Sequence, residues 1–257
     1  MQLEGASALV VGGAGGFGSA TVRRLVAAGA AVVIADMAED KGKALEASIG
    51  SDRVRFRVTD VTDPDSVKAA VAAAQDFGPL RAAVVVHGGP AAARRIVSRK
   101  GEVLPLEVFR RTVDIFLNGS YNVLSQSAAA MTANEPLESG QRGVVIMTAS
   151  IAGFEGQVGQ SDYAAAKGGV ISLTLTAARD LAATGVRVMT IAPGIFYTPA
   201  YGSMTEEEVQ ERWGSSVPNP KRMGNADEYA QLAMQVIDND YLNGEVIRID
   251  GALRFNI

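Results

Sequence analysis

Short apolar runs alternate along the chain with longer segments whose apolar residues recur at helical spacing. The runs cover residues 6–11, 30–35, 54–58, 82–86, 144–147, 185–191 and 245–249, lengths that are typical of buried strands. Helices are predicted over residues 41–49, 105–131, 161–183 and 227–237. Two further helices are predicted, one directly after the glycine-rich residues 12–18 and one that begins at Pro64. This order predicts an α/β protein: one domain over residues 1–257 with a doubly wound, mostly parallel seven-stranded sheet and helices on both faces.

Composition restricts the chemistry that such a fold can support. The 257 residues carry a net charge of -4 and include no cysteine and one histidine. Disulfides and thiolate metal sites are excluded, and we expect no metal. The acidic balance offers no basic stripe, so we expect no nucleic acid partner. The N-terminal residues lack a basic signal segment and the longest apolar run is too short for a bilayer. We therefore expect a cytoplasmic protein with no membrane partner.

A glycine-rich segment follows the first predicted strand. Gly12 and Gly16 are separated by three residues, and Phe17 stands between Gly16 and Gly18, where a helix begins. A strand, a glycine loop and a helix in this order direct backbone N–H groups and the positive helix end toward a pyrophosphate. The segment predicts a dinucleotide site in a Rossmann-type fold. A flexible glycine-rich turn is the alternative.

Asp36 stands at the C-terminal end of the second predicted strand, 24 residues after Gly12. A carboxylate in this place would accept hydrogen bonds from the ribose diol of adenosine and would repel a 2'-phosphate. No arginine or lysine lies immediately beside it in the sequence. We therefore predict NAD rather than NADP as the cofactor, with a strand-end carboxylate facing water as the alternative.

Ser150, Tyr163 and Lys167 are the candidate catalytic residues. Tyr163 and Lys167 are four positions apart with only alanines between them, so both side chains should project from one helical face. Bringing a phenol pKa from about 10 to near 7 takes roughly 4 kcal/mol, much of which a nearby ammonium can supply. Ser150 would offer its hydroxyl to the same reacting oxygen. Alone, the pair is also compatible with a solvated helix contact.

These motifs, followed by Pro193 and Gly194, occur in the order and spacing of the short-chain dehydrogenase/reductase family, which the chain resembles over nearly its whole length. The resemblance implies Tyr163 as the acid–base residue, Lys167 as the group that binds the nicotinamide ribose and lowers the tyrosine pKa, and Ser150 as the holder of the substrate oxygen. It also implies cofactor contacts at Gly12, Gly16, Phe17, Gly18, Asp36, Asp60, Val61, Gly88, Pro193, Gly194 and Thr198, and a substrate contact at Gln157.

Within the family, residues 140–144, 154–160, 187–194 and 242–248 are similar to dehydrogenases of 3-hydroxyacyl-CoA esters and hydroxysteroids. This resemblance implies NAD, such a substrate, a role in lipid metabolism and a homotetramer. A basic insertion at residues 94–101 would receive the phosphates of an acyl-CoA, although a solvated loop is the more common case. Residues 195–224 are expected to form a lid. A 3-oxoacyl carrier-protein reductase is the alternative enzyme.

Four positions depart from the family pattern, and one of them is Val11, where a threonine is usual. Phe116 stands where the family has an asparagine, and an aromatic ring cannot hold the water that links the lysine to solvent. Asn118 lies about 200° around a regular helix from Phe116, so it should face elsewhere unless a bulge re-aims it. Val85 replaces another asparagine, and His87 is either a polar shelf or a participant in proton movement. A dinucleotide-binding protein with little or no turnover is therefore the alternative of another class.

Overall fold

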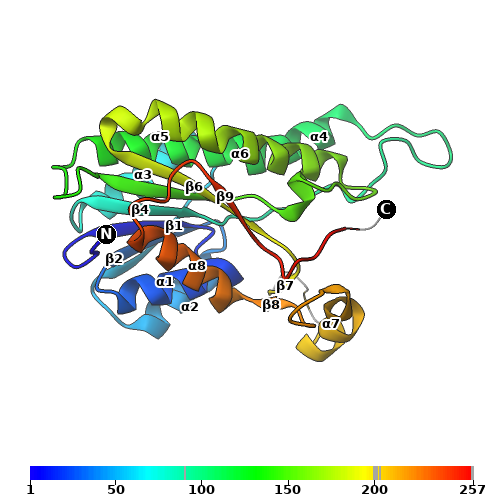
Figure 1. The fold of residues 1–257 in the computed structure, drawn as a ribbon, viewed down its shortest axis with the longest axis horizontal. Coiled ribbons are helices and arrows are strands. Elements are labelled where there is room, and N and C mark those ends of the chain that lie inside the picture. Colours follow the sequence, from blue (N-terminus) through cyan, green and yellow to red (C-terminus); the bar gives the residue numbers. More distant parts are fainter. Residues whose placement is uncertain (90, 199–201, 203, 256–257) are drawn as a thin grey trace.

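Seven parallel strands form the central sheet, in the order β3-β2-β1-β4-β5-β6-β9 (Figure 1). The computed structural model describes residues 1–89, 91–198, 202 and 204–255. The strands are β1 Ser7–Val11, β2 Ala31–Asp36, β3 Val54–Val58, β4 Leu80–Val85, β5 Gly143–Thr148, β6 Val186–Pro193 and β9 Val246–Ile249. The predicted doubly wound sheet is confirmed, because all seven apolar runs became neighbouring parallel strands.

Helices cover both faces of the sheet (Figure 1). One layer contains α1 Gly16–Ala27, α2 Glu39–Ile49 and α8 Ala226–Asp238, and the other contains α3 Pro64–Gln75, α4 Leu106–Val113, α5 Gly119–Thr132 and α6 Ser161–Asp180. Alternate residues of each strand enter one core or the other: Leu9 packs with Val123 and Val170, whereas Val10 packs with Leu25 and Tyr229. Burial on both faces explains why these strands read as continuous apolar runs.

The long helix predicted over residues 105–131 is interrupted, and that prediction is corrected. Between α4 and α5 the chain makes a π-helical turn, η1 Asp114–Asn118. The turn buries Phe116, while Asn118 is exposed and donates a hydrogen bond to Asp114 Oδ1 at 2.8 Å. The Ile115 carbonyl accepts a hydrogen bond from His87 Nε2 at 2.8 Å. The bulge therefore does not bring Asn118 into the position of Phe116.

The segment expected to be a lid contains two short strands that its composition does not predict. Strands β7 Phe196–Tyr197 and β8 Gly224–Asn225 pair in parallel, and α7 Glu206–Trp213 lies between them. Two-residue strands leave no periodic signal, so the sequence did not predict them. Residues 199–201 and 203 of the expected lid lie outside the described residues. None of the helices in the described ranges has both the length and the apolar composition needed to cross a membrane.

Candidate active site

A cavity of about 500 Å³ lies where β1, β2, β3 and β4 end at the carboxyl edge of the sheet. Five of the predicted cofactor residues line it, namely Gly12, Asp36, Asp60, Val61 and Gly88. The carboxyl edge at the point where strand order reverses is the usual ligand crevice of doubly wound sheets. The structure therefore brings these five residues together at one crevice, as their motifs predicted.

The glycine loop is held too tightly for side chains. Gly12 has a φ of 81°, and a Cβ at this position would overlap the backbone of His87. A Cβ at Gly18 would likewise overlap the Gly12 carbonyl oxygen. Because only glycine fits both places, the loop can pack closely against the segment after β4 and against the start of α1.

Asp36 fixes the shape of the loop through both of its carboxylate oxygens. Oδ2 accepts a hydrogen bond from the Ala14 N–H at 3.0 Å, and Oδ1 accepts one from the Ala38 N–H at 2.9 Å. Lys41 lines the same cavity, although it lies five residues further along the chain. Sequence reasoning missed this cation, because it considered only the immediate neighbours of Asp36. The first turn of α2 brings Lys41 back to the crevice.

Ser150, Tyr163 and Lys167 converge beyond the end of β5. Ser150 caps a short turn, η2 Ile151–Gly153, by accepting the Ala152 N–H at 3.1 Å, and it is hydrogen-bonded to Tyr163. Lys167, one helical turn after Tyr163 in α6, is 4 % exposed and donates to the Thr148 carbonyl oxygen at 2.6 Å. The predicted grouping of the three side chains is thus observed, and Thr148 is an additional member that no motif indicated.

The electrostatics of the pair differ from the prediction. Burial raises the pKa of Tyr163 above its ordinary value, and the hydrogen bond with Ser150 lowers it only in part. Burial also lowers the pKa of Lys167 to about 7. The expectation that Lys167 draws the phenol pKa toward 7 is wrong, because its Nζ is turned to Thr148 and lies 5.8 Å from the centre of the Tyr163 ring. Tyr163 therefore holds its proton at neutral pH.

Phe116 contacts both members of the pair. Its ring centre lies 4.8 Å from Lys167 Nζ, and its ring meets that of Tyr163 edge-on at 5.2 Å between centroids. On the cavity side, His87 lies nearly parallel to it, with 6.4 Å between centroids. The phenyl ring therefore occupies the space between the catalytic candidates and the dinucleotide crevice.

His87 is a neutral polar side chain that lines the cavity, and it does not act as a proton carrier. Burial and, to a lesser extent, the charge of Lys167 lower its pKa to about 4, so the imidazole is neutral at pH 7. Nε2 must carry the hydrogen that is donated to the Ile115 carbonyl oxygen. Nδ1 is then an acceptor, and within the described chain it has no hydrogen-bond partner. The predicted participation of His87 in proton movement is not supported.

The remaining predicted residues lie around this centre without lining the 500 Å³ cavity. Gly16 begins α1, and the Phe17 ring stacks on Tyr229 at 4.5 Å. Gly194 follows Pro193 at the end of β6 and donates its N–H to the Ile249 carbonyl oxygen at 2.9 Å. Thr198 is half-buried and Gln157 is exposed. Their roles as ligand contacts stay predictions.

Four cations of the basic insertion are exposed, namely Arg94, Arg95, Arg99 and Lys100. The insertion follows β4 and turns back through an isolated bridge between Val97 and Val103. None of the four cations forms an ion pair with any described residue. They are therefore available to an anionic group from outside the chain.

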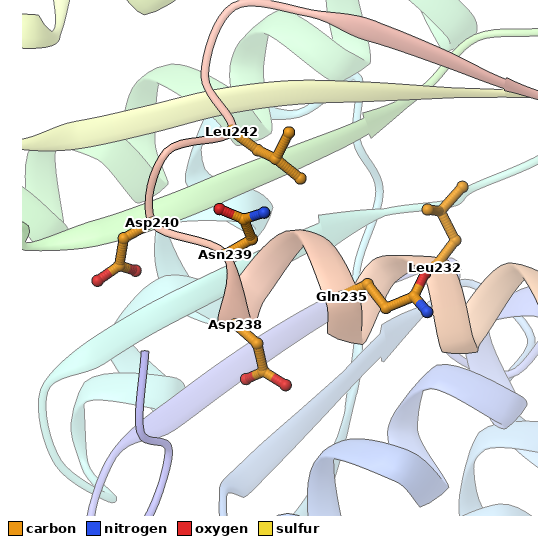
Figure 2. A pocket seen from close by; sticks show the side chains of 6 residues that line it. All are labelled: Leu232, Gln235, Asp238, Asn239, Asp240 and Leu242. Atoms are coloured by element: carbon orange, nitrogen blue, oxygen red, sulfur yellow. The ribbon is translucent and has the colours of Figure 1, made fainter.

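A second cavity, of about 640 Å³, lies beside the C-terminal end of α8 (Figure 2). Leu232, Gln235, Asp238, Asn239, Asp240 and Leu242 line it. The carboxylates of Asp238 and Asp240 point in different directions and do not converge on one point (Figure 2). None of the predicted site residues lines this cavity, so it is separate from the candidate active site.

Comparisons with known proteins agree with this geometry. Residues 6–209 match the family model for short chain dehydrogenases. The 3-hydroxyacyl-CoA dehydrogenase type-2 of Homo sapiens is 46% identical over 254 residues, covering 98% of this chain and 97% of that protein. A crystal structure of 3-hydroxyacyl-CoA dehydrogenase type-2 from Mycobacterium avium is 54% identical, with a TM-score of 0.95 over 99% of this chain and 98% of that one. A 3-oxoacyl-(acyl-carrier-protein) reductase of Thermotoga maritima is 32% identical over 98% of this chain and 99% of that protein.

Proposed function

Because the chain belongs to the short-chain dehydrogenase family, we propose that it transfers a hydride between NAD and a 3-hydroxyacyl-CoA or a related secondary alcohol such as a hydroxysteroid. It is an oxidoreductase that acts on a CH–OH group with a nicotinamide dinucleotide and a small-molecule substrate. The observation that carries the proposal is the convergence of Ser150, Tyr163 and Lys167 beside the dinucleotide crevice.

The residues present fit a nicotinamide dinucleotide. Gly12 and Gly18 stand where a Cβ would overlap neighbouring backbone, so the glycine loop beside the cavity needs glycine at both places, and Asp36 presents a carboxylate held by two backbone N–H groups. Asp36 favours NAD over NADP, whereas Lys41 in the same cavity is a cation that a 2'-phosphate would attract. We propose NAD because two backbone N–H groups fix the Asp36 carboxylate at the strand end, whereas the Lys41 side chain is exposed. When bound, the nicotinamide supplies or accepts the hydride.

In the proposed reaction, Tyr163 exchanges a proton with the substrate oxygen that Ser150 holds. The raised pKa keeps the phenol protonated at neutral pH, so Tyr163 is ready to donate a proton to a carbonyl oxygen during reduction. Oxidation of an alcohol needs the phenolate and should become faster as the pH rises. Lys167 and Thr198 are proposed to hold the nicotinamide end of the cofactor, together with Pro193 and Gly194.

Acyl-CoA is the substrate class that we favour. The unpaired cations of the basic insertion, at residues 94–101, suit the phosphates of coenzyme A. Gln157, in the loop after Ser150, is proposed to contact the acyl part, and residues 195–224 are proposed to close over it. Exposed apolar side chains on α5 and α6, Tyr121 at 57% and Leu175 at 46% exposure, support self-association as a homotetramer. A 3-oxoacyl carrier-protein reductase has less support, since the identity to such a relative is 32%.

A substrate panel tests the proposal. Purified protein is mixed with NAD or NADP and with 3-hydroxyacyl-CoA esters, hydroxysteroids and simple secondary alcohols, and NADH or NADPH absorbance is followed. We expect turnover with NAD and 3-hydroxyacyl-CoA, and a loss of about 10²- to 10⁴-fold in Tyr163→Phe with NADH binding retained. Binding of NADH without turnover of any alcohol by the wild-type protein would favour a dinucleotide-binding protein instead.

A further inference from the structure

The C-terminal turn, residues 250–253, contacts three segments that border the candidate active site. Its Asp250 packs so closely on Gly194 that a Cβ at position 194 would lie 2.8 Å from the Asp250 Cβ. Its Gly251 carbonyl oxygen accepts a hydrogen bond from the Asn219 N–H, in the expected lid, at 3.2 Å. The third contact is ionic and reaches the substrate loop, which we define as residues 154–157 after Ser150.

Four charged side chains make this ionic contact, and we call them the Glu155 cluster: Glu155, Arg248, Asp250 and Arg254. Glu155 Oε1 accepts from Arg248 Nη1 at 2.8 Å and lies 3.3 Å from Arg254 Nε. Asp250 Oδ2 accepts from Arg248 Nε at 2.7 Å and from Arg254 Nη1 at 3.1 Å. Cations and anions alternate, so each charge has two opposite neighbours and the cluster has no net charge.

Arg248 is the centre of the cluster. Its guanidinium also donates Nη2–H to the Leu253 carbonyl oxygen at 3.1 Å, and it lies 5.1 Å from the centre of the Phe154 ring. One rigid fork on β9 thus links the substrate loop to the C-terminal turn, through Glu155 on one side and Asp250 and Leu253 on the other. The single ammonium of a lysine lacks this planar fork. The Arg248 side chain is 21% exposed and that of Asp250 is 7% exposed, so water screens these bonds less than those of a surface pair.

Among the residues that the structure describes, the substrate loop has few other contacts. Phe154 is 46% exposed, Val158 just beyond the loop is 60% exposed, and Gln157 is exposed as well. Glu155 donates its N–H to Ile151 within the same turn, so this bond does not connect the loop to the rest of the fold. The Glu155 carboxylate, which also accepts the Phe255 N–H at 3.2 Å, is therefore the main link between the loop and the C-terminal segment.

We propose that Arg248 is a positioning residue that sets the place of the substrate loop, and with it the substrate, from the C-terminal turn. This inference rests on the proposed function of the site. Arg248 acts through Glu155 and not on the reacting atoms. Because the same turn contacts Gly194 and Asn219, a change at the substrate loop is transmitted to the cofactor side and to the expected lid through one group of residues.

Hydrogen–deuterium exchange of Arg248→Met tests the inference without any turnover. Methionine keeps an apolar stem and removes every charged hydrogen bond of the guanidinium. We expect about tenfold faster exchange in the substrate loop and in residues 253–255, because charge-assisted bonds of this kind are the strong ones. Arg24→Met is the matched control, since it breaks the exposed bidentate pair with Asp227 on another face. It should leave both segments unchanged.

Kinetics add a readout that a purely structural role would not change. Arg248→Met should raise the KM for the alcohol substrate about tenfold, with kcat within about threefold of the wild type. Glu155→Gln keeps the shape of the side chain and removes its charge, so it should raise the same KM by a smaller factor. If Arg248→Met does not fold, Glu155→Gln is the variant that tests the role of the cluster. Unchanged exchange in the substrate loop of both variants would overturn the role of Arg248. A wild-type protein without turnover would instead overturn the proposed function.

Discussion

Replacing Phe116 by asparagine changes the group that lies between the catalytic candidates and the cofactor crevice. In the native chain the Lys167 ammonium donates a hydrogen bond to the Thr148 carbonyl and lies 4.8 Å from the centre of the Phe116 ring. An asparagine amide would add a second acceptor for the ammonium and a place for a water molecule. We therefore expect Phe116→Asn to make proton exchange at Tyr163 faster.

The magnitudes follow from the contacts. The cation–π contact with Lys167 contributes about 1–2 kcal/mol and the edge-to-face contact with Tyr163 about 0.5–1.5 kcal/mol. Phe116 is 3% exposed, so its loss also leaves unfilled volume, and the free energy of unfolding should fall by about 3 kcal/mol in all. For a chain of this length, this change lowers Tm by roughly 6–12 °C. General acid–base steps are worth about 10²- to 10⁴-fold, so kcat should rise by about tenfold or more.

The assay is the initial rate of NADH formation at saturating NAD and alcohol, compared for Phe116→Asn, Phe116→Leu and the wild type. Phe116→Leu removes the ring and adds no polar group, so it should lose stability without gaining rate. A kcat for Phe116→Asn that falls to the value of Phe116→Leu would refute the reasoning, because the ring itself would then be required.

Three further changes have defined outcomes. Lys167→Met should raise Tm at pH 6, because a folded-state pKa of about 7 against an ordinary 10.5 makes the buried ammonium destabilising by on the order of 5 kcal/mol below pH 7. This gain should shrink between pH 7 and pH 10, as calorimetry over that range would reveal. For alcohol oxidation, kcat/KM should rise with pH through the neutral range, since burial raises the pKa of Tyr163, and a profile that is flat or falls would count against a tyrosine base. Asp36→Ala removes the acceptor of two backbone N–H groups and the charge that disfavours a 2'-phosphate. The KM for NAD should rise about tenfold and the KM for NADP should rise by less. If the ratio of the initial rate with NAD to that with NADP is the same in the variant as in the wild type, the proposed role of Asp36 is contradicted.

The sheet and the crevice were predictable because their signals are local. Each strand is an apolar run, Gly12 directly follows β1 and Asp36 ends β2, so the topology of the sheet alone brings them together. Ser150, Tyr163 and Lys167 were predictable for the same reason, since one helical turn and one strand end position them.

The electrostatics were not predictable, because burial depends on residues distant in sequence. The pKa of Lys167 is set by its enclosure and its charge is directed to Thr148, which belongs to another element. The π-helical turn at Phe116 and the link between Glu155 and Arg248 likewise depend on packing. Neither leaves a periodic or spaced pattern in the chain.

Transfer of deuterium from NADH that carries deuterium at both C4 positions of the nicotinamide tests the central claim most directly. In a single turnover with a 3-oxoacyl-CoA, the account predicts one deuterium on the product carbinol carbon, and transfer slower by about 10²- to 10⁴-fold in Tyr163→Phe. An unlabelled product, or equal rates in the two proteins, would contradict it.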